Sequence, residues 1–124
     1  HHEGAIAMDN CQRKFVAKRR KKIRDLNDRL RTTGEGGRIV ASRGVNALAP
    51  EILAQVLAAV RAFDGFTLSN DPWGEHDFGQ VVVDGRIYVW KIDYYTLNLD
   101  WCSLDPADES ITRRVMTLML DWEV

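Results

Sequence analysis

The feature that most restricts the fold of this 124-residue chain is an Asp84-Gly85 pair between two β-rich segments. Residues 81–83 are all valine, and the sequence Arg-Ile-Tyr-Val-Trp follows at residues 86–90. An Asp-Gly pair in this setting favours a two-residue type I′ turn, which matches the twist of a β-hairpin. The turn places Val83 opposite Arg86, so the numbers of paired residues sum to 169.

This register predicts which side chains share a face, because residues opposite each other in an antiparallel pair point to the same side. Gly79 lies opposite Trp90 and leaves room for the indole ring over its backbone. If the pairing continues to the strand end, His76 meets the carboxylate of Asp93, with Lys91 one step along the same face.

A long first helix is predicted over residues 10–32, which are rich in Lys, Arg, Leu and Ala and contain no Gly or Pro. Its apolar stripe, Ile23, Leu26 and Leu30, is confined to the C-terminal half. We therefore expect that half to dock on a core and the N-terminal half to project into solvent. Glycines at positions 34, 36 and 37 end the helix.

The rest of the chain predicts one short strand and two further helices. Residues 38–42 have the composition of a strand. Pro50 suits the first turn of a helix, and the apolar residues after it recur at helical spacing, which predicts a core helix. These residues are Ile52, Leu53, Val56, Leu57, Val60 and Phe63. Asp105-Pro106 predicts the start of a final helix. Its expected apolar stripe is Ile111, Val115, Leu118, Met119 and Trp122.

Together these elements predict a single α+β domain of order α-β-α-β-β-α, with an antiparallel hairpin packed against helices. The composition, 45% hydrophobic and 28% charged, is that of an ordinary globular protein. No apolar run approaches the ~18 residues of a membrane span. We assign residues 1–7 to an expression-tag remnant, residues 8–22 to a basic helical extension and residues 23–124 to the domain.

The formal net charge of -1 hides a strong separation of charge. Residues 9–32 hold ten basic and three acidic side chains, or +7, whereas residues 33–124 hold seven basic and fourteen acidic ones, or −7. A basic helix can follow phosphates, so it predicts a nucleic-acid or protein partner, with weak sequence specificity because no base-reading motif accompanies it. It could instead be a solvated terminus, or dock on the acidic part of a second copy to give a homodimer. The candidate binding residues are Arg13, Lys14, Lys18, Arg19, Arg20, Lys21, Lys22 and Arg24, together with the loop residue Trp73. Of the other tryptophans, Trp90 and Trp122 are expected to cap the core.

The polar segment at residues 70–79 carries the candidate chemistry. An Asp–His pair fixes the tautomer of an imidazole and raises its basicity, as general acid–base catalysis requires. The candidate catalytic residues are His76, Asp93, Lys91 and Glu75. The structural alternative is that Asn70 and Asp71 cap a turn while His76 and Asp93 close the mouth of the hairpin. A third possibility is a carboxylate metal site formed by Asp71, Glu75 and Asp77 with Asp93, although the spacing fits no EF-hand loop.

The two cysteines, Cys11 and Cys102, are far apart and form no CxxC motif, which favours a reduced, cytoplasmic protein. Cys102 and His76 could form a Cys–His site, although no local arrangement supports one. The chain has no P-loop, dinucleotide-binding, GxSxG or HExxH motif, and we expect no cofactor.

Several segments of the chain resemble a known bacterial family. They are residues 36–40, residues 70–79, Lys91-Ile92-Asp93-Tyr94-Tyr95, residues 105–108 and Thr112-Arg113-Arg114. The chain is similar in these segments to the family called domain of unknown function 3768, over a stretch from about Ile23 to the C-terminus. The family has no established activity, so the resemblance implies no catalytic role. It is found mainly in alphaproteobacteria, often on mobile elements.

We therefore expect a non-enzymatic binding or accessory protein that acts through a protein or nucleic-acid surface. By analogy with other small proteins of mobile elements, it could be an anti-restriction or anti-CRISPR factor. The alternative is an enzyme or metal-binding protein with a site at His76, Asp93, Glu75 and Asp77.

Overall fold

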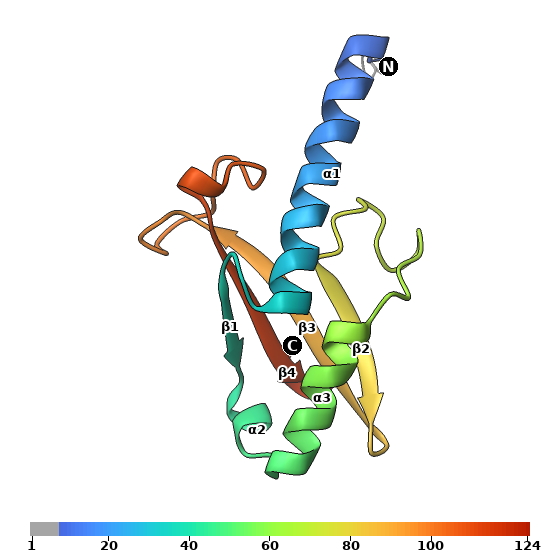
Figure 1. Ribbon diagram of the computed structural model, residues 1–124, viewed down its shortest axis with the longest axis vertical. Coiled ribbons are helices and arrows are strands. Elements are labelled where there is room, and N and C mark those ends of the chain that lie inside the picture. Colours follow the sequence, from blue (N-terminus) through green and yellow to red (C-terminus); the bar gives the residue numbers. More distant parts are fainter. Residues whose placement is uncertain (1–7) are drawn as a thin grey trace, which may run out of the picture.

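A computed structural model describes residues 8–124 of the chain, so the expected tag remnant at residues 1–7 lies outside the described residues. Three helices pack on one face of a four-stranded sheet, and the first helix extends well beyond the sheet (Figure 1). The predicted α+β class is confirmed.

The sheet has the strand order β1-β4-β3-β2. Its strands are β1 (Arg38–Ala41), β2 (Phe78–Val83), β3 (Arg86–Tyr95) and β4 (Arg113–Leu120). β1 runs parallel to β4, and the other two pairs are antiparallel. The predicted hairpin register is confirmed, because Val83 pairs with Arg86 and Gly79 pairs with Trp90.

The close packing of Gly79 against Trp90 is also confirmed. The Trp90 side chain is fully buried, and a Cβ atom added to Gly79 would lie 2.6 Å from its Nε1 atom. Real Cβ atoms do not approach so closely, so the absence of a side chain at position 79 lets the indole lie over the strand.

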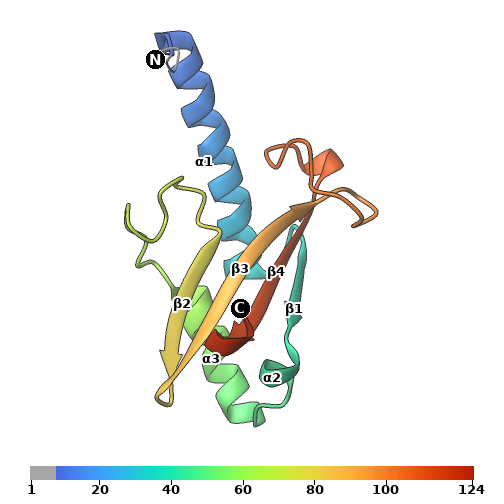
Figure 2. The same cartoon turned by 180° about the vertical axis from the view of Figure 1, so that it is seen from behind.

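Helix α1 (Asn10–Thr33) begins and ends where the sequence predicts. Asp9 and Gln12 form a capping box at its start, and Gly34, with φ 79°, terminates it through an N–H bond to Leu30. The C-terminal half of α1 contributes buried residues, whereas the N-terminal half projects from the body, which we define as residues 34–124 (Figures 1 and 2).

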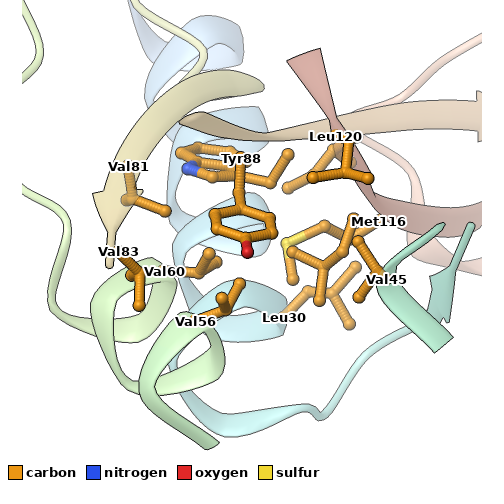
Figure 3. Packing of buried hydrophobic residues seen from close by; sticks show 12 residues of the cluster. Leu30, Val45, Val56, Val60, Val81, Val83, Tyr88, Met116 and Leu120 are labelled. Carbon is orange, nitrogen blue, oxygen red and sulfur yellow. The ribbon is translucent and has the colours of Figure 1, made fainter. Parts of the chain in front are cut away.

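Helices α2 (Arg43–Asn46) and α3 (Pro50–Ala62) complete the helical layer. Pro50 stands at the start of α3, as predicted, while the short helix α2 is not among the predicted elements. The core lies between this layer and the sheet (Figure 3). Its fully buried side chains come from every layer and include Leu30, Val45, Val56, Val60, Tyr88, Met116 and Leu118.

The final helix predicted after Asp105-Pro106 is wrong, because the segment forms strand β4. Met116, Leu118 and Leu120 alternate along this strand and face the core. Met119, on the opposite side, is also only 4% exposed. Because apolar residues lie on both faces of this strand, the sequence does not show the alternation expected of a strand and can be mistaken for the 3.6-residue spacing of a helix. The expected core position of Trp122 is wrong as well, since this side chain is 69% exposed.

Seen from behind, the sheet has a second face that none of α1, α2 or α3 covers (Figure 2). Side chains alternate along β3, so Lys91 and Asp93 lie on this face, while Trp90 and Ile92 lie on the helix-covered face. Within residues 8–124, no helix is both long enough and apolar enough to cross a membrane.

Candidate functional site

Asn27 is the centre of the contacts that hold α1 on the body. Its side chain is fully buried, and its amide donates to the Glu75 carbonyl at 2.9 Å and to the Tyr94 hydroxyl at 2.8 Å. Its Oδ1 accepts a 2.9 Å bond from Nε of Arg114, which is 2% exposed. One amide thus joins α1 to the loop before β2, to β3 and to β4. Buried polar groups need such partners, because an unsatisfied one destabilises the fold.

Arg31 ties the same helix to the end of α3. One guanidinium nitrogen donates to the carbonyl oxygens of Val60, Arg61 and Phe63 at 2.9–3.2 Å. A cation is favourable here because the carbonyls at a helix C-terminus carry partial negative charge. The guanidinium also lies 5.3 Å from the Trp90 ring centroid.

His76 lies beside α1 rather than at the hairpin mouth. Its Nδ1 is 2.9 Å from Oδ1 of Asp28, and its backbone N–H donates to the Asp71 carboxylate at 3.2 Å. The ring stacks on Phe66 with centroids 3.6 Å apart. His76 has φ 54°, which turns the chain away from the strand direction before β2 begins. The predicted pairing of His76 with Asp93 is therefore wrong: the described ladder ends at Phe78.

The four candidate catalytic residues fall on different sides of the sheet. His76 stacks on Phe66, which packs against the core between the sheet and the helices, whereas Lys91 and Asp93 pair with each other at 3.4 Å on the helix-free face. Glu75 accepts a 2.9 Å bond from the Tyr94 hydroxyl. His76 thus has two carboxylate neighbours, Asp28 and Asp71, and neither is the predicted partner Asp93.

The acidic residues proposed as metal ligands lie near enough to influence one another, but among the described residues they are not placed as a metal site. Burial and the nearby Glu75 carboxylate raise the pKa of Asp77, and burial raises that of Tyr94. Asp71, 7% exposed, uses its carboxylate to hold the backbone N–H of His76. Across residues 8–124 no three His, Cys, Asp or Glu side chains are placed to hold a metal ion.

Three arginines of the basic helix face the body. Arg19 forms a 3.0 Å ion pair with Asp105, and Arg24 donates to the Gly74 carbonyl at 3.0 Å. The Arg20 guanidinium lies 5.5 Å from the Trp73 ring centroid. Trp73 remains 65% exposed. These arginines therefore anchor α1 to the body, and their predicted partner binding stays a prediction.

The lysines of the basic helix point away from the core and form what we call the lysine face. Lys14, Lys18, Lys21 and Lys22 are spaced at i, i+4, i+7 and i+8, which places them on one side of a helix, and all four are exposed. Lys21 pairs with Asp25 at 2.6 Å. The other three form no ion pair with an acidic side chain among the described residues.

The remaining candidate, Arg13, lies at the N-terminal end of α1, next to this surface. Arg13 donates to the Asn10 side chain at 2.7 Å and to the Met8 carbonyl, so it caps the first turn of α1. Lys18 and Lys22 also line a shallow hollow of about 410 Å³ together with Asp105 and Asp108. The lysine face is thus bounded on one side by an acidic loop.

The cysteines offer no nucleophile close to His76. Both Cys11 and Cys102 are free and exposed. Cys102 pairs through its backbone with Tyr95 at the end of β3, and no hydrogen bond between Cys102 and His76 is found within residues 8–124.

Sequence reasoning missed the buried polar residues Asn27, Arg31 and Arg114. A signal existed for Asn27, because it lies four residues after Ile23 and three before Leu30, inside the apolar stripe of α1. A polar residue at such a position must find buried partners. Nothing local indicated that those partners would be Glu75, Tyr94 and Arg114, since they follow 48 to 87 residues later.

The sequence profile of a family described as "Protein of unknown function (DUF3768)" matches residues 41–123. The chain belongs to this family. The match begins at residue 41 rather than near Ile23, so it includes the loop of residues 70–79 and the β3 and β4 segments but not α1. No curated protein and no solved structure matches the chain.

Proposed function

We propose that this member of a family of unknown function is a non-enzymatic nucleic-acid-binding protein, which contacts the phosphate backbone through the lysine face of α1. The observation that carries the proposal is the separation of roles along α1. Arginines hold the helix on the body, while Lys14, Lys18, Lys21 and Lys22 stand together on its exposed side.

The dimensions of the lysine face suit a phosphate backbone. Lys14 and Lys22 are eight residues apart on α1, which corresponds to about 12 Å along the helix axis. Lysine ammonium groups on flexible stems act as point charges for phosphates without demanding one geometry. Because the body carries an excess of acidic residues, the projecting half of α1 is the part that a polyanion can approach with the least repulsion.

The geometry predicts binding with little sequence preference. Phosphate contacts orient a protein on the duplex but carry no base information. We expect duplex DNA to bind with an affinity that falls steeply with salt, because each neutralised phosphate releases a counterion.

The test compares the wild-type chain with a variant in which the four lysines are glutamine. Fluorescence anisotropy with a labelled duplex across a salt series gives the slope of log K against log salt. We expect the slope of the variant to be shallower by up to about 3.6, since each phosphate contact contributes about 0.9. The control replaces three exposed arginines of the body, Arg43, Arg61 and Arg86, with glutamine and should leave the slope almost unchanged.

Two results would contradict the proposal. The first is a wild-type protein that binds neither duplex DNA nor RNA at low salt. The second is an equal loss of binding in the lysine variant and the arginine control, which would indicate a response to net charge alone. An anti-restriction or anti-CRISPR role would be one use of such binding, and it stays a prediction.

A further inference from the structure

A cavity of about 470 Å³ lies at the end of the sheet where β1 and β4 begin, and none of the four lysines of the lysine face lines it. The segment before β1, the loop after β3 and the first residues of β4 form its walls. These segments lie side by side at one end of the sheet (Figures 1 and 2). Its volume is within the range of small-molecule sites, roughly 300–1,000 Å³. Residues that are far apart in the sequence, Gly36-Gly37-Arg38 and Thr112-Arg113-Arg114, meet in this cavity.

Two arginines of the cavity have no carboxylate partner among residues 8–124. Arg38 lies beside Val115 in the parallel pair, and Arg113 precedes Val115 by two residues, so all three side chains point to the helix-free face. Arg113 donates to the Leu97 carbonyl at 3.2 Å, and neither arginine forms an ion pair in the part of the chain that the structure describes. Glu109 is the acidic residue of the lining, and it pairs with Arg29 rather than with either of these arginines, at 3.8 Å between Oε1 and the guanidinium nitrogen.

The opposite wall is apolar and is held in a strained conformation. Leu97 and Leu99 are 52% and 42% exposed and line the same cavity. Leu99 has φ 66°, which is unfavourable for a residue with a bulky side chain. Thr96 maintains this loop, because its carbonyl accepts from the Leu99 N–H at 2.9 Å and its hydroxyl bonds Asn98 and Asp100. A strained, exposed leucine beside two unneutralised arginines indicates a site that is formed before its ligand binds.

We infer that the cavity binds a nucleoside 5′-phosphate, either as a free nucleotide or as the phosphorylated 5′ end of an oligonucleotide. A phosphate monoester carries close to two negative charges at neutral pH, which matches the two guanidinium groups of Arg38 and Arg113. A carboxylate would match only one of them. The sugar and base lie against Leu97 and Leu99, which accounts for an apolar wall beside a cationic one.

The experiment titrates the full ¹⁵N-labelled chain with adenosine 5′-monophosphate, adenosine, inorganic phosphate and a short oligonucleotide with or without a 5′-phosphate. We expect saturable amide shifts at Gly36, Gly37 and Arg113 with the monophosphate, and binding at least about tenfold weaker for adenosine and for phosphate alone. The R38Q and R113Q variants should each lose about tenfold in affinity. The control R86Q alters an exposed arginine at the far end of the same sheet and should bind as wild type.

The outcomes separate this inference from the proposed function. The variant with four glutamines on the lysine face should bind the monophosphate as wild type does. If the oligonucleotide shifts the cavity amides only when it carries a 5′-phosphate, the ligand can be the end of a nucleic acid. If the monophosphate shifts them and neither oligonucleotide does, the ligand is a free nucleotide. The inference is overturned if the monophosphate causes no shift at the cavity, if inorganic phosphate or adenosine binds equally well, or if R38Q and R113Q bind like wild type.

Discussion

Replacing Asn27 by alanine tests whether buried polar contacts hold α1 on the body. The substitution removes three hydrogen bonds at once and leaves the Glu75 carbonyl, the Tyr94 hydroxyl and the Arg114 guanidinium each without one partner. Because Arg114 is 2% exposed, water cannot take the place of the lost acceptor without rearrangement.

The expected magnitude follows from the kind of bond lost. The charged donor of Arg114 contributes about 2 kcal/mol, and the two bonds from the Asn27 amide about 1 kcal/mol each. We therefore expect N27A to lower the free energy of unfolding by about 4 kcal/mol. This is a large part of the roughly 5–15 kcal/mol by which a small domain is stable. The midpoint of thermal unfolding should fall by about 15 °C, at about 4 °C per kcal/mol for a domain of this size.

Urea denaturation followed by tryptophan fluorescence and circular dichroism measures this loss. The matched control is N46A, which removes one exposed side-chain bond, that from Asn46 to the Ala41 carbonyl, and should cost less than about 1 kcal/mol. A loss below about 1 kcal/mol for N27A would refute the reasoning. So would equal losses in both variants, because the buried bonds would then contribute no more than an exposed one.

Two further substitutions test the sheet and the loop before it. G79A should destabilise the fold by about 2 kcal/mol in urea denaturation, because its Cβ would lie 2.6 Å from Trp90 Nε1, and a fully stable variant would contradict the packing. Burial and the Glu75 carboxylate raise the pKa of Asp77 in the folded protein above its ordinary value of 3.8. Between the unfolded and the folded pKa the folded protein therefore binds more protons than the unfolded chain, so its stability falls as the pH rises through that interval. D77N should remove that loss and be more stable than wild type at pH 7, with the difference disappearing near pH 3; a difference that persists at low pH would contradict this cause.

The sequence was most informative where local chemistry fixes local structure. The Asp84-Gly85 turn predicted the hairpin register correctly, because a two-residue turn permits only one pairing of the strands that it joins. The bounds of α1 followed from a basic, glycine-free segment that ends at Gly34. Pro50 likewise marked the first turn of α3.

Strand β4 could not be assigned by the same means. It lies between β1 and β3, and the apolar residues Val115 and Met119 on its helix-free face add to those that face the core, so its apolar residues do not reveal a single period. The strand exists because partners on both sides complete its hydrogen bonds. One of these partners, β1, lies 77 residues earlier in the chain, where Arg38 pairs with Val115.

The position of His76 depended on long-range contacts in the same way. The hairpin register extends correctly to Phe78, but Asp28 and Asp71 hold His76 beside α1. Asp28 precedes His76 by 48 residues, and no pattern near residue 76 indicates it. The polar segment of residues 70–79 therefore holds local structure in place, as the structural alternative predicts. It does so against α1, and not across the mouth of the hairpin against β3.

The chemistry of arginine and lysine explains how one basic helix can be both anchored and available. A guanidinium is planar and weakly hydrated, so it can bond a carbonyl or lie over a ring with little loss of solvation, as Arg24 and Arg20 do. An ammonium group is strongly hydrated and keeps its water unless a strong anion replaces it. Exposed lysines such as Lys14 and Lys18 therefore remain in solvent even though the body is acidic. The net charge of -1 is thus compatible with a localised cationic surface, because most acidic residues lie in the body, from which the N-terminal half of α1 projects.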